Sequence, residues 1–129
     1  MKSAKDLNYI SGRIVDAAVH VHSRLGPGLL ETVYERILAY ELEKRGLLVA
    51  RQVPVSIVYD DLIFDEGFRA DLIVESAIVL ELKSVEAFAA VHGKQLLTYL
   101  KLLNCRLGLL INFGAPLLKD GIKRVANNL

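Results

Sequence analysis

The chain has 129 residues, of which 53% are hydrophobic and 24% are charged, and its formal net charge is +1. These proportions are typical of a globular protein with a core, and they exclude disordered, collagen-like and mucin-like chains. The length predicts one domain spanning residues 1–129, because a domain holds roughly 150 residues.

Cysteine content and hydropathy indicate the compartment. A single cysteine, Cys105, excludes a disulfide framework and a zinc or iron–sulfur site built from cysteines. One thiol and the lack of a signal-peptide pattern predict a cytoplasmic protein. No apolar run reaches about 18 residues, so we expect no contact with a membrane.

Charge is distributed unevenly along the chain. Residues 1–86 hold 10 Lys+Arg and 14 Asp+Glu, whereas residues 87–129 hold 6 Lys+Arg and one acid. An acidic pocket beside a basic rim would produce this difference. A solvated surface on which the charged residues are unevenly distributed is the simpler interpretation of this charge pattern when it is considered alone.

Apolar residues at helical spacing predict three helices, over residues 8–24, 29–45 and 89–103. Residues 26–28 (Gly-Pro-Gly) separate the first two helices, and Gly46 suits the C-terminal cap of the second. The apolar stripe of the second helix comprises Leu30, Val33, Tyr34, Ile37, Leu38 and Leu42.

The first predicted strand follows directly. Apolar residues alternate over residues 49–59, which favours a strand. Pro54 removes one ladder donor, so this strand should lie at an edge or carry a bulge. Residues 60–61 (Asp-Asp) suit a turn, and residues 62–64 suit a short partner strand.

A hairpin and a buried strand complete the predicted sheet. Residues 68–75 and 77–85 alternate in polarity and are joined closely enough for a hairpin. Residues 106–113 are mostly apolar, which is typical of a strand buried on both faces. Residues 119–126 suit a short strand or helix. Hairpins followed by a helical crossover predict an α/β (α+β) fold with a central mixed β-sheet flanked by helices.

Asp71, Glu81 and Lys83 form the central candidate site. On a strand Glu81 and Lys83 share a face, and Val79 and Val85 on that face indicate partial burial. A three-residue hairpin loop would set Asp71 opposite Glu81, with the side chains within about 5 Å. Two opposed carboxylates repel each other unless a divalent cation lies between them, and Mg²⁺ takes such ligands together with waters. Lys83 would then reach a phosphate oxygen or the attacking water.

A cross-strand salt-bridge network accounts for the same residues without a ligand. In this register Arg69 lies opposite Lys83, and Asp71 and Glu81 would neutralise both cations. The E-x-K pattern alone occurs by chance in many proteins, so the residues by themselves leave both interpretations open.

Two helices offer further polar residues. Glu31 lies at the edge of an apolar stripe and can reach the sheet. Alternatively, it is an acid in the first helical turn that the helix dipole stabilises. Glu35 lies further round, and we interpret it as a surface residue. Gln95 and Tyr99 share a helix face with His92, and this row either borders a phosphate or forms the edge of an amphipathic helix.

Other motifs are weak or absent. His20 and His22 do not face each other on a helix, and Cys105 is expected to be a small buried hydrophobe. No P-loop, G-x-G-x-x-G, H-E-x-x-H or G-x-S-x-G occurs, which argues against nucleotide-fold, zincin and serine-hydrolase activities. Lys119, Lys123 and Arg124 are candidate phosphate contacts, or simply solvated bases near a terminus.

Together these segments resemble a known family. Residues 28–34 read G-x-x-E-x-x-Y, and the likeness continues through FRADLIVE (68–75), VLELKSVE (79–86), QLLTYL (95–100) and GLLINFG (108–114). The chain resembles the small bacterial GxxExxY proteins, a branch of the PD-(D/E)XK nuclease superfamily, over most of its length. The run from Gln95 to Tyr99 is similar to the Q-x-x-x-Y of RecB-like nucleases. The resemblance implies a restriction-endonuclease-like core.

The resemblance also implies roles for individual residues. Asp71 matches the first metal-binding aspartate, although Ala70 stands where the superfamily name has proline. Glu81 matches the acidic ligand of E-x-K, the backbone carbonyl of Leu82 a further ligand, and Lys83 the catalytic lysine. The helical residues that match are Glu31, the acid of the helix before the core, and Gln95 and Tyr99, which would position the phosphate or support the lysine.

These matches predict a nuclease that hydrolyses phosphodiester bonds with Mg²⁺ or Mn²⁺ as cofactor, DNA being favoured as substrate. In a nuclease, Lys94 and Lys101 would join Lys119, Lys123 and Arg124 as contacts to the nucleic-acid backbone. The alternative is a catalytically silent nuclease-fold protein that acts as a binding or regulatory module, which the small size and near-zero net charge favour. A plain structural domain with a salt-bridge network is a third hypothesis. Because the chain contains no DNA-reading module, we expect a homodimer or a partner protein.

Overall fold

The computed structural model describes residues 2–129, within which three α-helices and one five-stranded mixed sheet occur. The helices are α1 (Ala4–Leu25), α2 (Glu31–Lys44) and α3 (Ala90–Leu103). The strands are β1 (Val49–Tyr59), β2 (Leu62–Val74), β3 (Ile78–Lys83), β4 (Leu107–Asn112) and β5 (Ile122–Ala126), with a 3₁₀ turn, η1 (Leu118–Gly121), before β5. This is an α+β fold consistent with a restriction-endonuclease-like core, as the sequence predicts.

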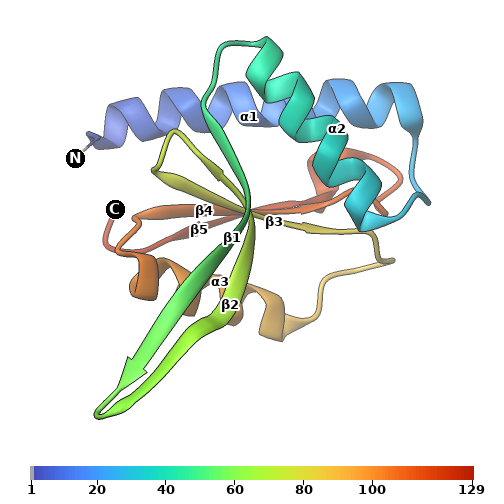
Figure 1. Cartoon of the computed structure of the whole chain (residues 1–129). Helices are drawn as coiled ribbons and strands as arrows, with labels where there is room; N and C mark the ends of the chain where they lie inside the picture. Colours follow the sequence, from blue (N-terminus) through green and yellow to red (C-terminus); the bar gives the residue numbers. More distant parts are fainter. Residues whose placement is uncertain (1) are drawn as a thin grey trace.

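The sheet separates two helical layers. Its strand order is β1-β2-β3-β4-β5, and only the β3–β4 pair among the described strands is parallel, because α3 crosses over between them. Figure 1 shows α1 and α2 on one side of the sheet and α3 on the other. In the part of the chain that the structure describes, no helix has the length and apolar character needed to cross a membrane.

Each face of the sheet has its own hydrophobic core. The larger one, the α1/α2 core, includes Ile14, Tyr34, Leu38, Leu72, Leu80 and Leu82. The smaller one, the α3 core, comprises Ala70, Val79, Leu96, Leu100, Leu110 and Val125. Every residue of β4 is buried, which confirms the prediction of a strand covered on both faces.

The first helix begins four residues earlier than apolar spacing predicts. The Ser3 side chain accepts a hydrogen bond from the Asp6 backbone N–H, and the Asp6 carboxylate accepts one from the Ser3 N–H. This reciprocal pair is a capping box, which satisfies N–H groups that a helix start leaves free. The predicted start at residue 8 is therefore wrong, because apolar spacing does not report a polar cap.

The second helix begins at Glu31 rather than at residue 29. Leu30 precedes the first turn with an extended backbone and is 73% exposed, and Val33 is also exposed. These two residues therefore do not belong to the buried stripe that the sequence predicts. Leu38 and Leu42 are fully buried, as predicted.

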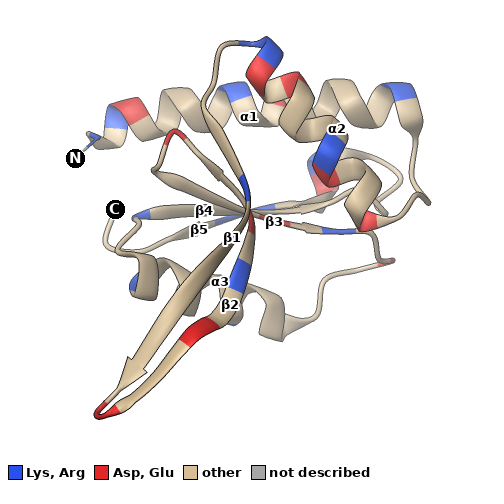
Figure 2. Ribbon diagram, in the orientation of Figure 1, with Lys and Arg blue, Asp and Glu red and all other residues tan. Residues whose placement is uncertain are grey.

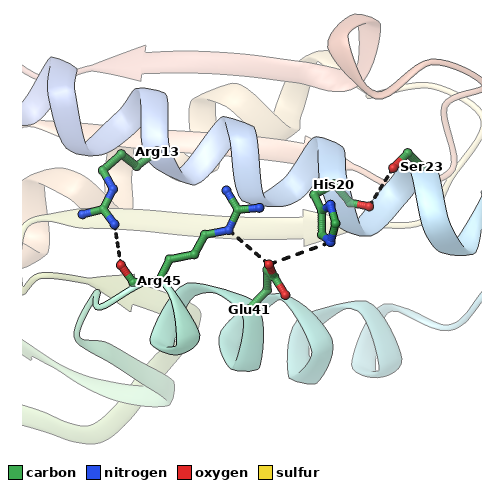
Figure 3. A network of polar contacts seen from close by, with 5 residues as sticks. All are labelled: Arg13, His20, Ser23, Glu41 and Arg45. Carbon is green, nitrogen blue, oxygen red and sulfur yellow. Dashed lines mark hydrogen bonds and ion pairs between the residues drawn. The ribbon is translucent and has the colours of Figure 1, made fainter.

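Polar contacts fix α2 against α1 (Figure 3). Arg13 donates a hydrogen bond to the Arg45 carbonyl, and Arg45 pairs with the Glu41 carboxylate at 3.1 Å. His20 Nε2 lies 3.9 Å from the same carboxylate. Because Glu41 is almost fully buried, loss of these partners would leave a buried charge uncompensated. The network therefore orients α2, whose first turns carry two acids towards the sheet.

β1 and β2 form a long two-stranded ribbon that extends beyond the helices (Figure 1). β1 is an edge strand, and the register shifts after Val55, where Ser56 faces residues 65–67 on β2. The prediction that Pro54 requires an edge strand or a bulge is confirmed. Residues 62–64, predicted as a separate short strand, are part of the continuous strand β2. The interruption of the apolar–polar alternation after residue 64 coincides with this register shift and does not end the strand.

The end of this ribbon, the β1–β2 arm (residues 56–67), is apolar and acidic. Its exposed apolar residues are Val58, Tyr59, Leu62, Ile63 and Phe64. Its charged residues are Asp60, Asp61, Asp65 and Glu66, and no Lys or Arg lies within it (Figure 2).

β2 changes faces at Asp71. Leu72 packs in the α1/α2 core, whereas Ala70, two residues earlier, packs in the α3 core. Residues two apart in a regular strand share a face, so β2 is kinked here. On β1, Gln52 at the facing position has a φ of 49°, in the left-handed region. Asp71 therefore lies where β2 separates from β3, next to the outermost residue pair of the hairpin, Leu72 and Leu80.

Candidate functional site

Asp71 and Glu81 face each other at the open end of the β2–β3 hairpin. They are the positions next in register after the Leu72–Leu80 pair, as a three-residue loop predicts. The Asp71 backbone N–H donates to Glu81 Oε1 at 3.3 Å. The backbone N–H of Leu82 donates to Asp71 Oδ2 at 2.9 Å. These bonds place the two carboxylates in the gap between the diverging strands.

The Leu82 carbonyl borders the same gap. In a strand the N–H and C=O of one residue lie on the same edge, and the Leu82 N–H points towards Asp71. β2 no longer pairs with β3 at this position, so the Leu82 carbonyl has no ladder partner on that edge. It is therefore available as a third oxygen beside the Asp71 and Glu81 carboxylates.

Burial and repulsion perturb both acids. Burial, followed by the nearby charge of Asp71, raises the pKa of Glu81 to about 8. Burial also raises the pKa of Asp71, against the hydrogen bond from Leu82, and the charge of Glu35 contributes to the increase. At neutral pH the pair therefore retains a proton, which a divalent cation would displace.

The available ligands suit a hard cation that keeps waters. Across residues 2–129, no group of three or more His, Cys, Asp or Glu side chains is arranged to hold a metal. A closed zinc site is therefore not formed by these residues. Two carboxylates and one carbonyl are all oxygen ligands, and Mg²⁺ is commonly held by one or two carboxylates with several waters retained.

Lys83 continues the row of charged residues on β3. It lines a narrow cleft together with Glu81, His92, Gln95, Leu96, Tyr99 and Leu110. Among the residues that the structure describes, no cation lies within 4.0 Å of the Asp71 or Glu81 carboxylate, and Arg69 pairs with Glu66 instead. The cross-strand salt-bridge network is therefore not formed, because the kink at Asp71 turns Arg69 away from β3.

The polar row on α3 closes this cleft from the opposite side. Gln95 and Tyr99 line the cleft with Glu81, as their helical spacing predicts. Tyr99 stacks on Phe68 of β2 at 3.9 Å between ring centroids. Burial, with the negative charges of Glu81 and Asp71, raises the pKa of Tyr99, so it remains a neutral phenol that can donate.

Two acids approach from α2. Glu31 Oε2 lies 3.4 Å from the Ser84 backbone nitrogen, directly after β3, so it reaches the sheet end as predicted. Glu35 is only 4% exposed, and Arg51 and Gln52 both donate to its carboxylate. The interpretation of Glu35 as a surface residue is wrong, because the kinked strand β1 covers that side of α2.

The comparison with known families decides the assignment. A family model of the PD-(D/E)XK nuclease superfamily matches residues 8–125. The chain belongs to the PD-(D/E)XK nuclease superfamily. A search of curated proteins and a search of solved structures each found no match to the chain. Membership of the PD-(D/E)XK superfamily supports a nuclease-like function.

The five candidate basic residues of this PD-(D/E)XK protein do not form one patch. Lys94, Lys123 and Arg124 border one surface hollow between α3 and β5, and Lys101 is exposed two turns after Lys94. Arg124 donates to Asn8 of α1 at 2.6 Å, on the other side of the sheet. Lys119 borders a separate hollow beside α1. The structure therefore brings four of the five near α3, although the Arg124 guanidinium is bonded to α1, and it places Lys119 apart.

Sequence reasoning did not single out Asn112, which anchors the segment after the motif lysine. Asn112 is 2% exposed, its side chain accepts from the backbone N–H groups of Val85 and Gly114, and it donates to the Val85 carbonyl. A Cβ at Gly114 would lie 2.3 Å from that carbonyl oxygen, so only glycine fits. A polar residue at the end of an otherwise apolar strand was the available signal.

Tyr34 has a structural role within the G-x-x-E-x-x-Y segment. Its hydroxyl donates to the Gly26 carbonyl at 2.5 Å and accepts from the Leu29 N–H, and its ring stacks on Phe113. It thereby closes the loop before α2 and sets the position of Glu31.

Proposed function

We propose that this protein is a divalent-metal-dependent nuclease that hydrolyses phosphodiester bonds of nucleic acid, with DNA as the favoured substrate. The observation that carries the proposal is the opposed pair of Asp71 and Glu81 beside Lys83, in a chain of the PD-(D/E)XK superfamily. Two partly buried carboxylates with no cation within 4.0 Å among the described residues are unfavourable for stability alone, which supports a ligand between them. The GxxExxY and RecB-like relationships remain predictions.

Asp71, Glu81 and the Leu82 carbonyl would hold Mg²⁺ or Mn²⁺, and Glu31 is close enough to the end of β3 to assist. When bound, such an ion supplies positive charge at the phosphate and acidifies a coordinated water. The displaced proton leaves from the shared pair, because the raised pKa of Glu81 keeps it protonated without the ion.

Three residues of the cleft would act on the substrate. The Lys83 ammonium lies on the same strand face as Glu81 and would offset charge that develops on the phosphate. The Gln95 amide and the Tyr99 hydroxyl lie on the α3 side and would orient the phosphate as donors. The Phe68 ring holds Tyr99 in place through stacking.

The nucleic-acid backbone would run along α3. Lys94, Lys101 and Lys123 are exposed on that side, whereas Lys119 borders a separate hollow and the Arg124 guanidinium is already bonded to Asn8, so these two would contribute little. The β1–β2 arm is excluded from this surface because it carries four acids and no cation. Such a small contact surface is why we propose that a second copy or a partner protein completes the grip on a duplex.

The test is cleavage of end-labelled single- and double-stranded DNA and RNA with Mg²⁺, Mn²⁺ or EDTA. We expect cleavage that needs the metal and is lost in Glu81→Gln, while Glu66→Gln, an exposed acid paired with Arg69, cleaves like the wild type. Equal cleavage by wild type and Glu81→Gln would indicate a contaminant. Absence of cleavage on every substrate would favour the catalytically silent binding module.

A further inference from the structure

His92 lines the cleft but has no role in the function proposed above. Its ring borders the same narrow space as Glu81, Lys83, Gln95 and Tyr99. His92, Gln95 and Tyr99 are spaced three and four residues apart on α3, so they form one continuous row along the helix. The edge of Phe88 packs against the His92 ring, with centroids 6.1 Å apart, and limits its rotation.

The start of α3 fixes the tautomer of this ring. The Ala89 backbone N–H donates to His92 Nδ1 at 3.1 Å, so Nδ1 carries a lone pair and no proton. In a neutral imidazole the other nitrogen, Nε2, then carries the proton and is a donor. Within residues 2–129, Nε2 has no hydrogen-bond partner. His92 thus carries one unused N–H on a ring that borders the cleft.

The cleft already holds two donors that suit an anion. The Lys83 ammonium and the Gln95 amide can both donate to oxygen, whereas the Glu81 carboxylate only accepts when ionised. A phosphate oxygen offers several lone pairs and binds best where donors converge. A third donor from His92 completes such a set without adding a charge that Glu81 would attract.

We propose that His92 binds and positions the substrate phosphate through Nε2–H, as a neutral donor locked by the N-terminal turn of α3. The proposal rests on the nuclease function proposed above. It assigns His92 a substrate contact beyond its bond to Ala89, which by itself would be only a helix cap.

Two substitutions separate these roles. Gln and Glu at this helix position can both accept a hydrogen bond from the Ala89 N–H, as in a capping box. Only Gln keeps a donor for phosphate, whereas Glu presents a negative charge. His92→Ala removes both functions. Val91→Glu adds the same charge at an exposed neighbouring position and serves as the matched control.

We expect kcat/KM for a labelled DNA substrate to fall about 100-fold in His92→Glu and about 10-fold in His92→Ala, with His92→Gln within about threefold of wild type. His92→Glu and His92→Gln should melt at similar temperatures. Affinity for a labelled single-stranded oligonucleotide, measured in the Lys83→Ala background, should follow the same order of variants.

Equal losses in His92→Glu and His92→Gln would overturn the proposal, because His92 would then act only as a cap. An equal loss in Val91→Glu would also overturn it, because the effect would then be general charge repulsion. If the wild type cleaves no substrate, and the oligonucleotide affinities of the variants still follow the expected order, the nuclease function fails and phosphate binding by His92 stands. If neither cleavage nor binding depends on His92, this inference fails.

Discussion

The backbone N–H of Asp71 donates to the Glu81 carboxylate across the end of the β2–β3 hairpin, at 3.3 Å. This bond holds two partly buried acids opposite each other at the point where β2 turns away from β3. The kink at Asp71 creates the gap in which both carboxylates and the Leu82 carbonyl meet. A local irregularity of one strand therefore forms the candidate metal site.

Removing one acid should stabilise the metal-free protein. Glu81→Gln replaces a carboxylate that is strained by burial and by Asp71, so we expect a higher melting temperature in EDTA than for wild type. The increase in melting temperature on adding Mg²⁺ or Mn²⁺ should appear in wild type and vanish in the variant. Differential scanning fluorimetry measures both effects, with Glu66→Gln as control. A melting temperature in EDTA that is lower for Glu81→Gln than for the wild type would contradict the repulsion between Asp71 and Glu81.

Stability of the metal-free protein should fall as pH rises. The pKa of Glu81 is about 8 in the folded protein, against 4.5 for its ordinary value. A folded-state pKa above the unfolded one adds stability that is complete below about pH 4.5 and is lost as pH rises through about 8. Urea unfolding in EDTA between pH 5 and pH 9 should therefore show a decline that is flatter in Glu81→Gln. Parallel profiles for the two proteins would contradict this assignment.

Lys83 should matter for cleavage rather than for stability. No carboxylate lies within 4.0 Å of its ammonium among the described residues, so Lys83→Ala should change the free energy of unfolding by less than about 1 kcal/mol. Its kcat should fall about 100- to 1,000-fold, as for loss of one donor to a developing charge. Lys44→Ala, an exposed lysine on α2, is the control. Marked destabilisation by Lys83→Ala with unchanged kcat would support a structural salt bridge instead.

Glu35 should stabilise the kinked strand. Glu35→Ala leaves the Arg51 guanidinium and the Gln52 amide without their carboxylate partner, so we expect a loss of about 1–3 kcal/mol in the free energy of unfolding. Glu43→Ala, an exposed acid on the same helix, should change it by less than about 0.5 kcal/mol. Urea unfolding of the two variants measures the difference, and equal stabilities would show that the buried cluster contributes nothing.

The β1–β2 arm provides a test of whether the expected partner is a second copy of the chain rather than another protein. A two-stranded ribbon is marginally stable alone, and this one exposes Ile63 by 69% and Phe64 by 52%. We expect wild type to sediment as a dimer at micromolar concentration and the double variant Ile63→Lys, Phe64→Lys to sediment as a monomer. Leu48→Ser, which alters another exposed apolar residue, should leave the dimer intact. A monomeric wild type at every concentration would refute association through the arm.

The sequence by itself determined the periodic parts of this protein. Alternation and helical spacing identify β1, the β2–β3 hairpin, β4 and the three helices, because side-chain burial follows the geometry of each element. The turn of Glu75, Ser76 and Ala77 also determines that Asp71 faces Glu81, since register follows directly from loop length. The opposed acids were therefore predictable from local pattern.

The tertiary structure decided which polar residues are buried and what they contact. The kink opposite Gln52, with its positive φ, is not visible in an alternating pattern, yet it separates Arg69 from Lys83 and covers Glu35. Helix starts also depended on contacts that spacing does not report, such as the cap at Ser3. Burial of a charge depends on what packs over it, and that packing comes from segments distant in the sequence.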